Sequence, residues 1–354
     1  MSTTERNQPK IVVIGGGSGS SVLLRGLKAH TTDITSIVTM FDSGGSSGIL
    51  RDEFGYPPLG DLRQCLVALA EDDGNTAALR MAFNFRFSKK SSLNGHSVGN
   101  LILAALTSRH QGLQGAIDEM SQMLKLRGRV MPVTLERADL CAELEDGTVV
   151  RTEAAIDLRG EETPAIRRVF LDREVAANPR AIEAILQADA VVLGPGDLYT
   201  SIVPNLLAGG IPEALRETKA PIIYVCNLMT KLGETGGYGA SDFAAAIVRY
   251  LGGRKIDFAV VHTEPVPDEI REQYAAEGAT PVNPDLEDLS LHAREIVTGV
   301  YANPGPKFRH DQERLAYAVL SVAIGKGAAP TGAARHTRAA RIGQVADLAF
   351  DSHT

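Results

Sequence analysis

The amino-acid sequence predicts an α/β protein with a Rossmann-like, doubly wound and mainly parallel sheet that carries a small β-rich insertion. Short apolar, β-branched segments alternate with segments of helical periodicity along most of the chain, which is typical of parallel sheets covered by helices. Glycine-rich turns follow several of the apolar segments, as expected where strands lead into helices at one edge of such a sheet. The 354 residues, 44% of them hydrophobic, suffice for one large domain or two smaller ones.

The first part of the chain alternates strands and helices. Residues 10–30, KIVVIGGGSGSSVLLRGLKAH, predict a strand, a glycine turn and an amphipathic helix. A second strand is predicted at 34–42, and a polar loop at 43–60. Asp61 is expected to be the N-cap of the next helix, because it precedes the apolar segment LRQCLVALA. Three more helices are predicted over residues 76–87, 95–110 and 113–125.

In the second part of the chain, the pattern of polar and apolar residues changes. Residues 127–170 alternate polar and apolar side chains around EDG, a hairpin turn signal, and predict the β-rich insertion. The α/β rhythm then returns, with Asn178 as N-cap and Pro179 at the first position of a helix. Further strands are predicted in ADAVVLGPG and over 220–230 and 255–263, and further helices over 241–253 and 311–324. The domain is expected to span 10–326, and 327–354, without a persistent apolar face, are predicted to be a mobile C-terminal tail.

Composition excludes several classes of protein. The net charge of −7 argues against nucleic acid or an anionic membrane as the main partner. Three cysteines without metal-binding spacing argue against a zinc site and fit a reducing cytosol. A polar N-terminus and the lack of any segment near 18 apolar residues predict a cytoplasmic protein without membrane spans. The oligomeric state stays open, with a homo-oligomer among the alternatives, and so does any downstream protein partner.

The first candidate binding element is the glycine loop after the first strand, GGGSGSS. Glycines there let the backbone approach a phosphate, and the N–H groups of the helix start supply positive potential. The spacing is not a full dinucleotide fingerprint, since Ser20 stands where a third glycine would be, and no P-loop lysine follows. A bare strand-to-helix turn is the alternative. The candidate phosphate-binding residues are Gly15, Gly16, Gly17, Ser18 and Gly19.

The second candidate is FDSGGSSG, which directly follows the second strand. Asp42 stands where a Rossmann-type acid accepts hydrogen bonds from ribose hydroxyls. The next residues offer consecutive N–H donors and two hydroxyls, which is typical of an anion-binding nest. A flexible turn capped by Asp42 is the alternative. The candidate nest residues are Gly44, Gly45, Ser46 and Ser47.

Two further polar segments precede apolar helices. In PPLGDLRQC, Asp61 is either a helix cap or, together with Asp42, a ligand of Mg²⁺ beside a phosphate. Arg63 either donates paired hydrogen bonds to a phosphate or is an ordinary surface arginine. In LNGHSVGN, His96 lies in a polar loop, as expected of an anion donor or general acid, and Asn100 is a ligand contact or a cap.

Two more loops follow strands later in the chain. VVLGPGDLYTS ends a buried strand with a rigid turn, and its candidate ligand contacts are Gly194, Gly196, Tyr199 and Thr200, the last with helix capping as the alternative. CNLMTKLGETGGY is the analogous loop after another strand and offers Asn227. Several glycine and hydroxyl loops at one sheet edge together predict a large, polar, phosphorylated ligand.

These motifs, in this order, resemble the CofD/YvcK family, and most closely its YvcK branch. The matching segments are GGGSGSSVLLRGLK, DSGGSSGILRDEFGYPPLGDLRQCLVALA, GHSVGNLILAAL, LGPGDLYTSIVPN and VCNLMTKLGET, within residues 10–326. The resemblance implies two lines of function. CofD-type transferases move a phospholactyl-type group from a nucleotide diphosphate carrier to a deazaflavin alcohol with Mg²⁺. YvcK-type proteins are cytoplasmic, bind nucleotide sugars such as UDP-N-acetylglucosamine, and support cell shape and cell-wall homeostasis during gluconeogenic growth.

The resemblance also assigns two residues outside the loops. Tyr274, in REQYAAEGATPV, and Arg309, in FRHD, match positions expected to contact the nucleotide sugar. The alternatives are that Tyr274 packs on the last helix and that Arg309 pairs with Asp311. One departure is Ser43, which stands where the family has a second acid and which weakens the case for metal binding.

The leading hypothesis is therefore a nucleotide-sugar-binding regulator that requires no cofactor, rather than an enzyme. The alternative is a group-transfer enzyme on a diphosphate carrier, in which Mg²⁺ would be held by Asp42 and Asp61. The candidate catalytic residues of that alternative are Asp42, Asp61 and His96. A dinucleotide-dependent oxidoreductase is a third, weaker alternative, against which the broken fingerprint argues.

Overall fold

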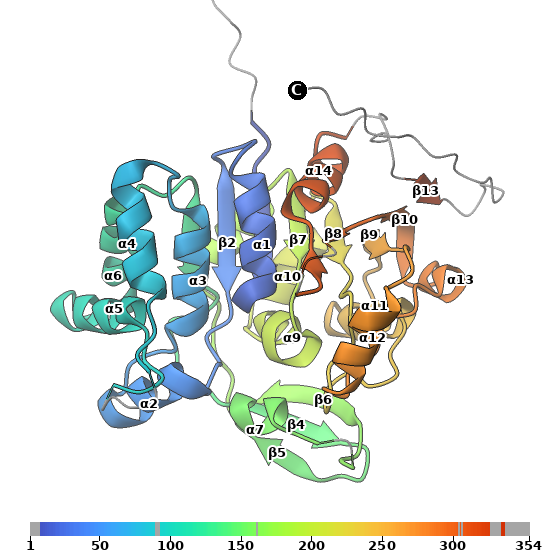
Figure 1. Ribbon diagram of the computed structural model, residues 1–354, viewed down its shortest axis with the longest axis horizontal. Coiled ribbons are helices and arrows are strands. Elements are labelled where there is room, and N and C mark those ends of the chain that lie inside the picture. Colours follow the sequence, from blue (N-terminus) through green and yellow to red (C-terminus); the bar gives the residue numbers. More distant parts are fainter. Residues whose placement is uncertain are drawn as a thin grey trace, which may run out of the picture.

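The core of the molecule is an eight-stranded sheet in the order β13-β10-β9-β8-β7-β1-β2-β3 (Figure 1). The computed structural model describes residues 8–88, 93–160, 162–303, 305, 307–325 and 334–336. Seven strands run parallel, and β13 pairs antiparallel with β10. The predicted α/β class with a mainly parallel sheet is confirmed. The strands are β1 (Ile11–Gly15), β2 (Ile34–Val38), β3 (Arg129–Pro132), β7 (Ala190–Leu193), β8 (Ile222–Val225), β9 (Ile256–His262), β10 (Ala293–Gly299) and β13 (Ala334–His336).

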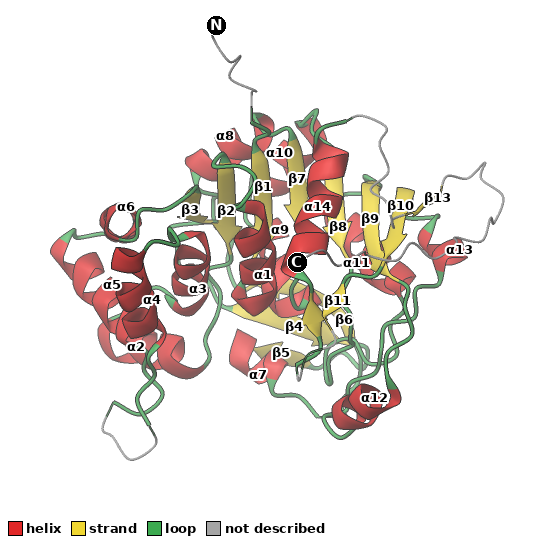
Figure 2. Ribbon diagram, turned by 45° about the horizontal axis from the view of Figure 1, so that its top comes forward, coloured by secondary structure: helices red, strands yellow, loops and turns green. Residues whose placement is uncertain are grey.

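Helices cover both faces of this sheet. In Figure 1, α1, α3 and α14 lie side by side on one face, and Figure 2 shows α8 and α10 behind the strands. The central strands β1, β2, β7 and β8 are buried along their whole length, as expected when helices cover both faces. The helices are α1 (Gly17–Leu27), α2 (Gly45–Phe54), α3 (Gly60–Leu69), α4 (Gly74–Asn84), α5 (Val98–Arg109), α6 (Leu113–Met123), α7 (Glu153–Asp157), α8 (Pro179–Leu186), α9 (Val203–Leu206), α10 (Ile211–Glu217), α11 (Ala240–Tyr250), α12 (Asp268–Ala275), α13 (Leu286–Leu289) and α14 (Gln312–Ala323), with a π-helical turn η1 (Leu198–Ile202).

The strand order reverses between β1 and β7. From β1 the chain adds β2 and then β3 on one side, whereas β7, β8, β9 and β10 follow one another on the other side. Ligands of doubly wound sheets bind at such a reversal, in the crevice beyond the carboxyl ends of the strands. The fold therefore places the functional crevice next to β1 and β7.

The predicted insertion is real but begins later than residue 127. Residues 129–132 form β3, which pairs with β2 at the edge of the main sheet. The separate three-stranded sheet consists of β4 (Leu140–Leu144), β5 (Val149–Arg151) and β6 (Ile166–Leu171), in the order β5-β4-β6. Figure 1 shows this sheet beyond the carboxyl ends of the main strands, so the insertion faces the crevice.

Other local predictions have mixed outcomes. Asn178 caps α8 by accepting the N–H of Arg180, as predicted. Asp61 does not cap α3, because the helix starts at Gly60 with Leu59 as its N-cap, and Asp61 lies within the first turn. Two strands of two residues each, β11 (Ala302–Asn303) and β12 (Arg309–His310), pair antiparallel before α14 begins.

The predicted tail lies mostly outside the described residues. Of 327–354, the structure describes 334–336, which form β13 and extend the main sheet. Within the described parts of the chain, every helix is too short or too polar to cross a lipid bilayer.

Candidate functional site

Two glycine loops meet at the reversal point of the sheet. The loop after β1 contacts the loop after β7, where Ser20 donates through Oγ to the carbonyl of Pro195 at 3.4 Å. A Cβ added to Gly19 would lie 2.5 Å from the same carbonyl oxygen, so the two backbones touch and leave room for glycine alone. The peptide bond between Gly194 and Pro195 is cis. The predicted binding residues in the loops after β1 and β7 therefore form one continuous border of the crevice.

Two helices start at this border without side-chain caps. Gly16 precedes α1 and Gly44 precedes α2, and neither offers a side-chain acceptor to the first N–H groups of its helix. β1 and β2 are paired neighbours, and α1 begins two residues after β1 and α2 seven residues after β2, so both helices start beyond the same edge of the sheet. The first N–H groups of the helices and the positive ends of two helix dipoles make this edge suitable for an anion, and the N–H of Gly17 is already bonded to the carboxyl group of Asp61.

The serines of the second glycine loop are directed into the protein. Ser47 is buried and accepts the N–H of Gly60 at 3.2 Å. Ser46 is buried and its Oγ lies 2.9 Å from Nδ1 of His96. The hydroxyls of these two serines therefore hold the loop in place, which leaves its backbone N–H groups as the donors of the predicted nest.

A chain of buried polar side chains continues beneath this loop. Asn100 donates to Ser46 Oγ at 3.1 Å and accepts from Nε of Arg63 at 3.1 Å, and Arg63 also donates to Asn84 at 2.7 Å. His96, Asn100 and Arg63 are each less than a tenth exposed. His96 and Asn100 thus both contact Ser46, Arg63 contacts Asn100, and this network supports the loop.

Three carboxylates crowd the floor of the crevice. Asp42 accepts the N–H of Gly44 at 2.8 Å, and Asp61 lies against the glycine loop, where a Cβ on Gly16 would approach its Oδ2 to 2.3 Å. Burial, and then the charge of Asp42, raise the pKa of Asp61 to about 7, although the N–H of Gly17 opposes the shift. Burial, and then Asp42, likewise raise the pKa of Glu153 to about 8. Crowded acids with raised pKa values are typical of functional sites.

Glu153 comes from the insertion and stands beside the residue that departs from the family pattern. Its Oε2 accepts the N–H of Ser43 at 3.1 Å, and Ser43 Oγ in turn accepts the N–H of Ala154 at 2.9 Å. A second carboxylate is thus present next to Asp42, supplied by α7 from more than a hundred residues away in the sequence. The departure at Ser43 therefore does not leave Asp42 without a neighbouring carboxylate.

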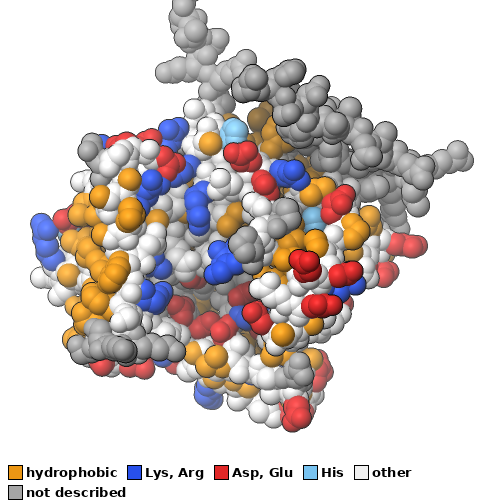
Figure 3. Space-filling model, viewed as in Figure 1, with side chains coloured by type: hydrophobic (Ala, Val, Ile, Leu, Met, Phe, Trp, Pro, Cys, Tyr) orange, Lys and Arg blue, Asp and Glu red, His pale blue; other side chains and the backbone are white. Residues whose placement is uncertain are grey.

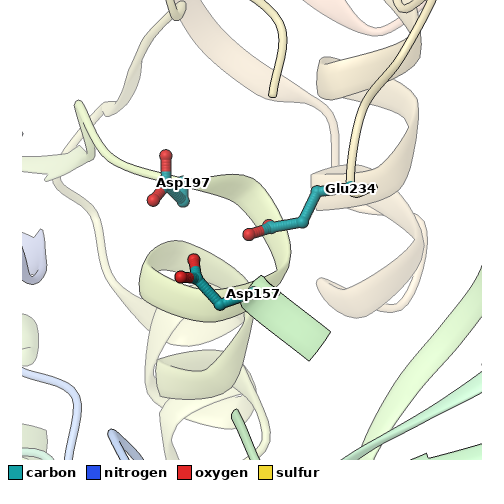
Figure 4. A group of neighbouring side chains, drawn as sticks. All are labelled: Asp157, Asp197 and Glu234. Carbon is teal, nitrogen blue, oxygen red and sulfur yellow. The ribbon is translucent and has the colours of Figure 1, made fainter. Parts of the chain in front are cut away.

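A second acidic group surrounds a lysine between the insertion and the later loops. Figure 4 shows Asp157, Asp197 and Glu234 pointing toward one another, with ligand oxygens within 4.8 Å, a spacing that could hold a metal ion. Nζ of Lys231 contacts all three, at 2.8 Å from Asp197 and 2.9 Å from Glu234. Burial alone would lower the pKa of Lys231, but Glu234 and Asp197 raise it overall, so the ammonium stays charged.

The polar residues after β7 and β8 mostly bind this group. Glu234, fully buried, accepts the N–H of Tyr199 at 3.2 Å and the hydroxyl of Thr200 at 3.0 Å. The Tyr199 hydroxyl lies 3.0 Å from that of Tyr238. Asn227 donates to the carbonyl of Gly196 at 3.0 Å, and its Oδ1 has no partner among the described residues. Of these candidates, Asn227 is therefore the one with unused hydrogen-bonding capacity.

The two residues implied by the family resemblance lie apart from the glycine loops. Tyr274 packs in a small apolar cluster with Leu228, Val266 and Phe308, rather than on the last helix, and its hydroxyl donates to the carbonyl of Phe308 at 3.3 Å. Arg309 is exposed on β12. Burial lowers the pKa of the Arg25 guanidinium, and the charge of Arg309 lowers it further.

Asp311 caps the last helix. Its Oδ1 accepts the N–H groups of Glu313 and Arg314, each at 3.0 Å. The role of the Asp311 carboxylate is therefore to cap this helix, and not to pair with Arg309 as the alternative suggested.

Charge is unevenly distributed around the crevice. Figure 3 shows the middle of this face hollowed, with acidic side chains gathered along its lower side and basic side chains above them. A cavity of about 590 Å³ lies elsewhere, between α6, β3 and α8, and is lined mainly by polar surface residues. None of the predicted site residues lines it, so size alone does not identify the site.

Sequence reasoning missed the contributions of α7. Glu153 and Asp157 are four residues apart, a spacing that places two side chains on one face of a helix. That spacing, and the acidic residues of TEAAID, were available signals, but 127–170 was treated only as an insertion. Lys231 and Glu234 were noticed as polar residues of a loop without being assigned to an ion-pair network.

The raised pKa values predict a fall in stability with rising pH. The folded protein keeps protons on Asp61 and Glu153 that the unfolded chain has released, so their contribution is complete near pH 4 and is lost as the pH rises through 7 to 8. Between about pH 5 and 7, Asp61→Asn should flatten the dependence of the free energy of unfolding on pH by up to about 1.4 kcal/mol per pH unit. Urea unfolding at several pH values would measure it.

The matched control is the exposed acid Glu217, changed to Gln. The buried His310, whose pKa burial lowers to about 4, gives a slope of the opposite sign between about pH 4 and 6.5, but both variants keep this histidine, so its effect cancels when they are compared. Equal slopes for Asp61→Asn and Glu217→Gln would contradict the protonation of Asp61.

Comparison with known proteins places the chain in a family. Residues 11–300 match the family model described as 2-phospho-L-lactate transferase CofD. A protein of Bacillus subtilis named gluconeogenesis factor is 43% identical over 311 residues, covering 87% of this chain and 96% of the relative. A gluconeogenesis factor of Halalkalibacterium halodurans is 43% identical over 312 residues, covering 88% and 95%.

Solved structures agree with the sequence comparison. A crystal structure of a Bacillus halodurans protein superposes with a TM-score of 0.84 at 42% identity, covering 89% of this chain and all of that one. Another, described as a member of the UPF0052 family from the same organism, gives a TM-score of 0.82. The chain therefore belongs to the CofD family and is similar over most of its length to relatives named gluconeogenesis factors.

Proposed function

We propose that the protein is a cytoplasmic regulator that binds a nucleotide sugar of the UDP-N-acetylglucosamine type in the crevice between β1 and β7. The observation that carries this proposal is the pair of helix starts without side-chain caps, at Gly16 and Gly44, beyond the same edge of the sheet and beside the reversal of strand order. Their N–H groups and dipoles suit the two negative charges of a diphosphate. The names of the relatives support a role in gluconeogenic growth, and we extend this to cell shape and cell-wall homeostasis.

The ligand would lie along the sheet edge. The diphosphate would contact the amides of residues 16–19 and 44–47, and hydroxyls of the ribose or sugar would meet Asp42 and the unused Oδ1 of Asn227. Tyr274 and Arg309 would approach the sugar, as the family resemblance implies. This arrangement uses binding alone and assigns no catalytic step.

Calorimetric titration tests the proposal directly. UDP-N-acetylglucosamine, GDP and NAD would each be titrated with Mg²⁺ and with a chelator. We expect UDP-N-acetylglucosamine to bind in both conditions and more tightly than the other two. Failure of every nucleotide to bind would contradict the proposal.

Asp42→Asn is the matching prediction for the second glycine loop. If Asp42 accepts a hydrogen bond from the ligand, the variant should lose about tenfold or more in affinity, since hydrogen bonds to charged groups contribute about 1.5–3 kcal/mol. Asp52→Asn, an exposed acid on α2, is the control and should bind normally. Equal affinities of the two variants would show that Asp42 does not face the ligand.

A second candidate is a CofD-type transferase of a phosphorus-containing group. The crowding of Asp42, Asp61 and Glu153 favours it, because carboxylate oxygens are the ligands that Mg²⁺ prefers. Bound there, Mg²⁺ would neutralise charge on the diphosphate of the carrier. Loss of the protons of Asp61 and Glu153 would prepare these groups to hold the ion, and His96 would keep the second loop in position through Ser46.

The two candidates differ in their need for metal. Guanine-nucleotide binding that requires Mg²⁺, together with transfer of a phospholactyl-type group from the nucleotide diphosphate carrier to a deazaflavin alcohol, would favour the transferase. Nucleotide-sugar binding with a chelator present, and no turnover of such an acceptor, would favour the regulator.

A further inference from the structure

The helix α4 presents a row of apolar side chains to solvent. Figure 3 shows hydrophobic side chains gathered over α4 and α5, at the left of this face. Met81 is 76% exposed, and Phe85, which directly follows the helix, is 55% exposed. The exposed apolar residues recur at the spacing of one helical face: Ala78, Met81, Ala82 and Phe85. Such a face normally packs on the core of a soluble protein, but here it points outward.

The next helix, α5, continues this apolar surface. Its sequence VGNLILAALTSR is apolar almost all round, which is typical of a helix covered on every side. One of its faces is nevertheless only half-buried or exposed, and its members are Val98, Leu101, Ile102 and Ala105. The N–H of Val98 donates to the carbonyl of Phe85 at 3.0 Å, so the two rows of side chains meet there. We call these eight residues of α4, Phe85 and α5 the α4–α5 seam.

The size of the seam fits a protein interface. A large side chain carries about 150–250 Å² of surface, so Met81 and Phe85 alone expose roughly 250 Å², and the whole seam about 500 Å². Apolar patches of this size on single molecules are often functional. Homodimer interfaces are about 65% apolar, and stable ones bury about 800 Å² on each partner. The seam and a polar rim therefore have the extent that one copy contributes to a dimer.

The charges at the two ends of α4 indicate which partner fits. Asp72 and Asp73 precede the helix, and Arg86 follows it. Arg86 is exposed and donates to the carbonyl of Gly95, and none of the ion pairs among the described residues includes it. If two copies of α4 packed antiparallel, Arg86 of each copy would lie near Asp72 of the other. A second copy of this chain necessarily carries that complementary arrangement.

We propose that the α4–α5 seam is the interface of a homodimer in which the α4 helices of two copies pack antiparallel about a two-fold axis. A two-fold axis brings the same patch of both copies together, so both apolar seams are covered at once and the assembly closes at two copies. The inference does not depend on the proposed function, because it requires no ligand.

The interface helices also support the candidate site. Asn84, at the end of α4, accepts a hydrogen bond from Arg63, and Asn100, in the first turn of α5, donates to Ser46 of the second glycine loop. The dimer would therefore hold in place the two helices on which this loop rests.

The test is the oligomeric state of the full-length protein, measured by sedimentation equilibrium at several concentrations. The wild type should be a dimer at micromolar concentration. Met81→Glu and Phe85→Glu each place a carboxylate in the seam, twice per dimer because of the symmetry, and should raise the dimer dissociation constant at least about a hundredfold. Leu158→Glu, at a residue that is 82% exposed outside the seam, is the control and should stay dimeric. Circular dichroism of each variant at a concentration where it is monomeric would show that the fold is intact.

Two further variants test the antiparallel arrangement. Arg86→Glu should weaken the dimer about tenfold, since it places like charges opposite each other. Ala82→Cys, near the middle of the row on α4, should be linked between copies by a short bismaleimide, and Leu158→Cys should not. The three native cysteines are buried, so they should not react with the reagent.

The outcomes decide the proposal. A wild type that stays monomeric over the whole concentration range would overturn it, and so would a dimer that Met81→Glu and Phe85→Glu leave intact. A dimer that Arg86→Glu does not weaken, or in which Ala82→Cys is not linked, would overturn the antiparallel arrangement. Dissociation of both glutamate variants of the seam, with the fold intact and Leu158→Glu still dimeric, would support it.

Discussion

The Lys231→Met variant is expected to unfold at a much lower urea concentration than the wild type. Nζ of Lys231 is the cation shared by Asp157, Asp197 and Glu234, and the side chain of Glu234 is fully buried. Removing one partner of a buried ion pair typically costs about 3–5 kcal/mol, because the remaining charge is left without compensation. Burial already raises the pKa of Glu234, so this carboxyl should become protonated in the variant. The loss in the free energy of unfolding should therefore lie toward the lower end of that range.

The same variant should acquire a response to divalent cations. Once the ammonium is removed, three carboxylates remain with ligand oxygens within 4.8 Å of one another. Ca²⁺ or Mn²⁺ should then restore part of the free energy of unfolding, since binding to the folded state alone stabilises it. The wild type, in which Lys231 contacts all three carboxylates, should respond less at this place.

Lys219→Met is the matched control, because Lys219 is exposed. Urea unfolding of both variants, each with a chelator and with added metal, measures the effect. A loss for Lys231→Met no larger than that of the control would mean that the three carboxylates do not depend on the lysine.

The second large effect is expected for Gly19→Ala. The added Cβ would lie 2.5 Å from the carbonyl oxygen of Pro195 and 2.8 Å from its carbonyl carbon, both in backbone that cannot rotate away. The loops after β1 and β7 must then separate. Overpacking of this kind typically costs about 1–3 kcal/mol, which corresponds to roughly a tenfold to hundredfold loss of nucleotide-sugar affinity if the bound state carries it.

Gly74→Ala provides the comparison for this substitution. Gly74 opens α4, and a Cβ there would meet nothing within 4 Å. Calorimetric titration and thermal unfolding of both variants separate a binding defect from a folding defect. If Gly19→Ala bound the ligand as tightly as Gly74→Ala, the contact between the two loops would not shape the site.

The sequence predicted the central strands because their signals are local. Segments such as ITSIV are β-branched and fully buried, and they follow or precede glycine turns. β10, AREIVTG, was not predicted, since charged residues interrupt its apolar pattern and its burial depends on β9. β3 was assigned to the insertion because no local pattern indicates which sheet a short strand joins.

The site residues that the sequence predicts are polar residues and glycines that come directly after a strand. Asp42 and the two glycine loops lie at the expected sheet edge because parallel strands bring their carboxyl ends together. Glu153 was missed, because its contact with Ser43 spans 110 residues and depends on how the insertion docks. Asp61 lies near Asp42, as its alternative interpretation as a metal ligand requires, but the prediction that it caps the helix was wrong, since α3 already begins at Gly60.

The short helix α7 connects the two halves of the sheet across the reversal of strand order. Glu153, at its start, holds the loop after β2 through Ser43, and Asp157, at its end, contacts Lys231 in the loop after β8. One turn of helix thus works as a spacer between two walls that belong to opposite sides of the crevice. Any opening or narrowing of the crevice must strain or shift this spacer, and with it the three-stranded sheet that carries it. The outer surface of that sheet is therefore mechanically linked to the state of a site it does not line.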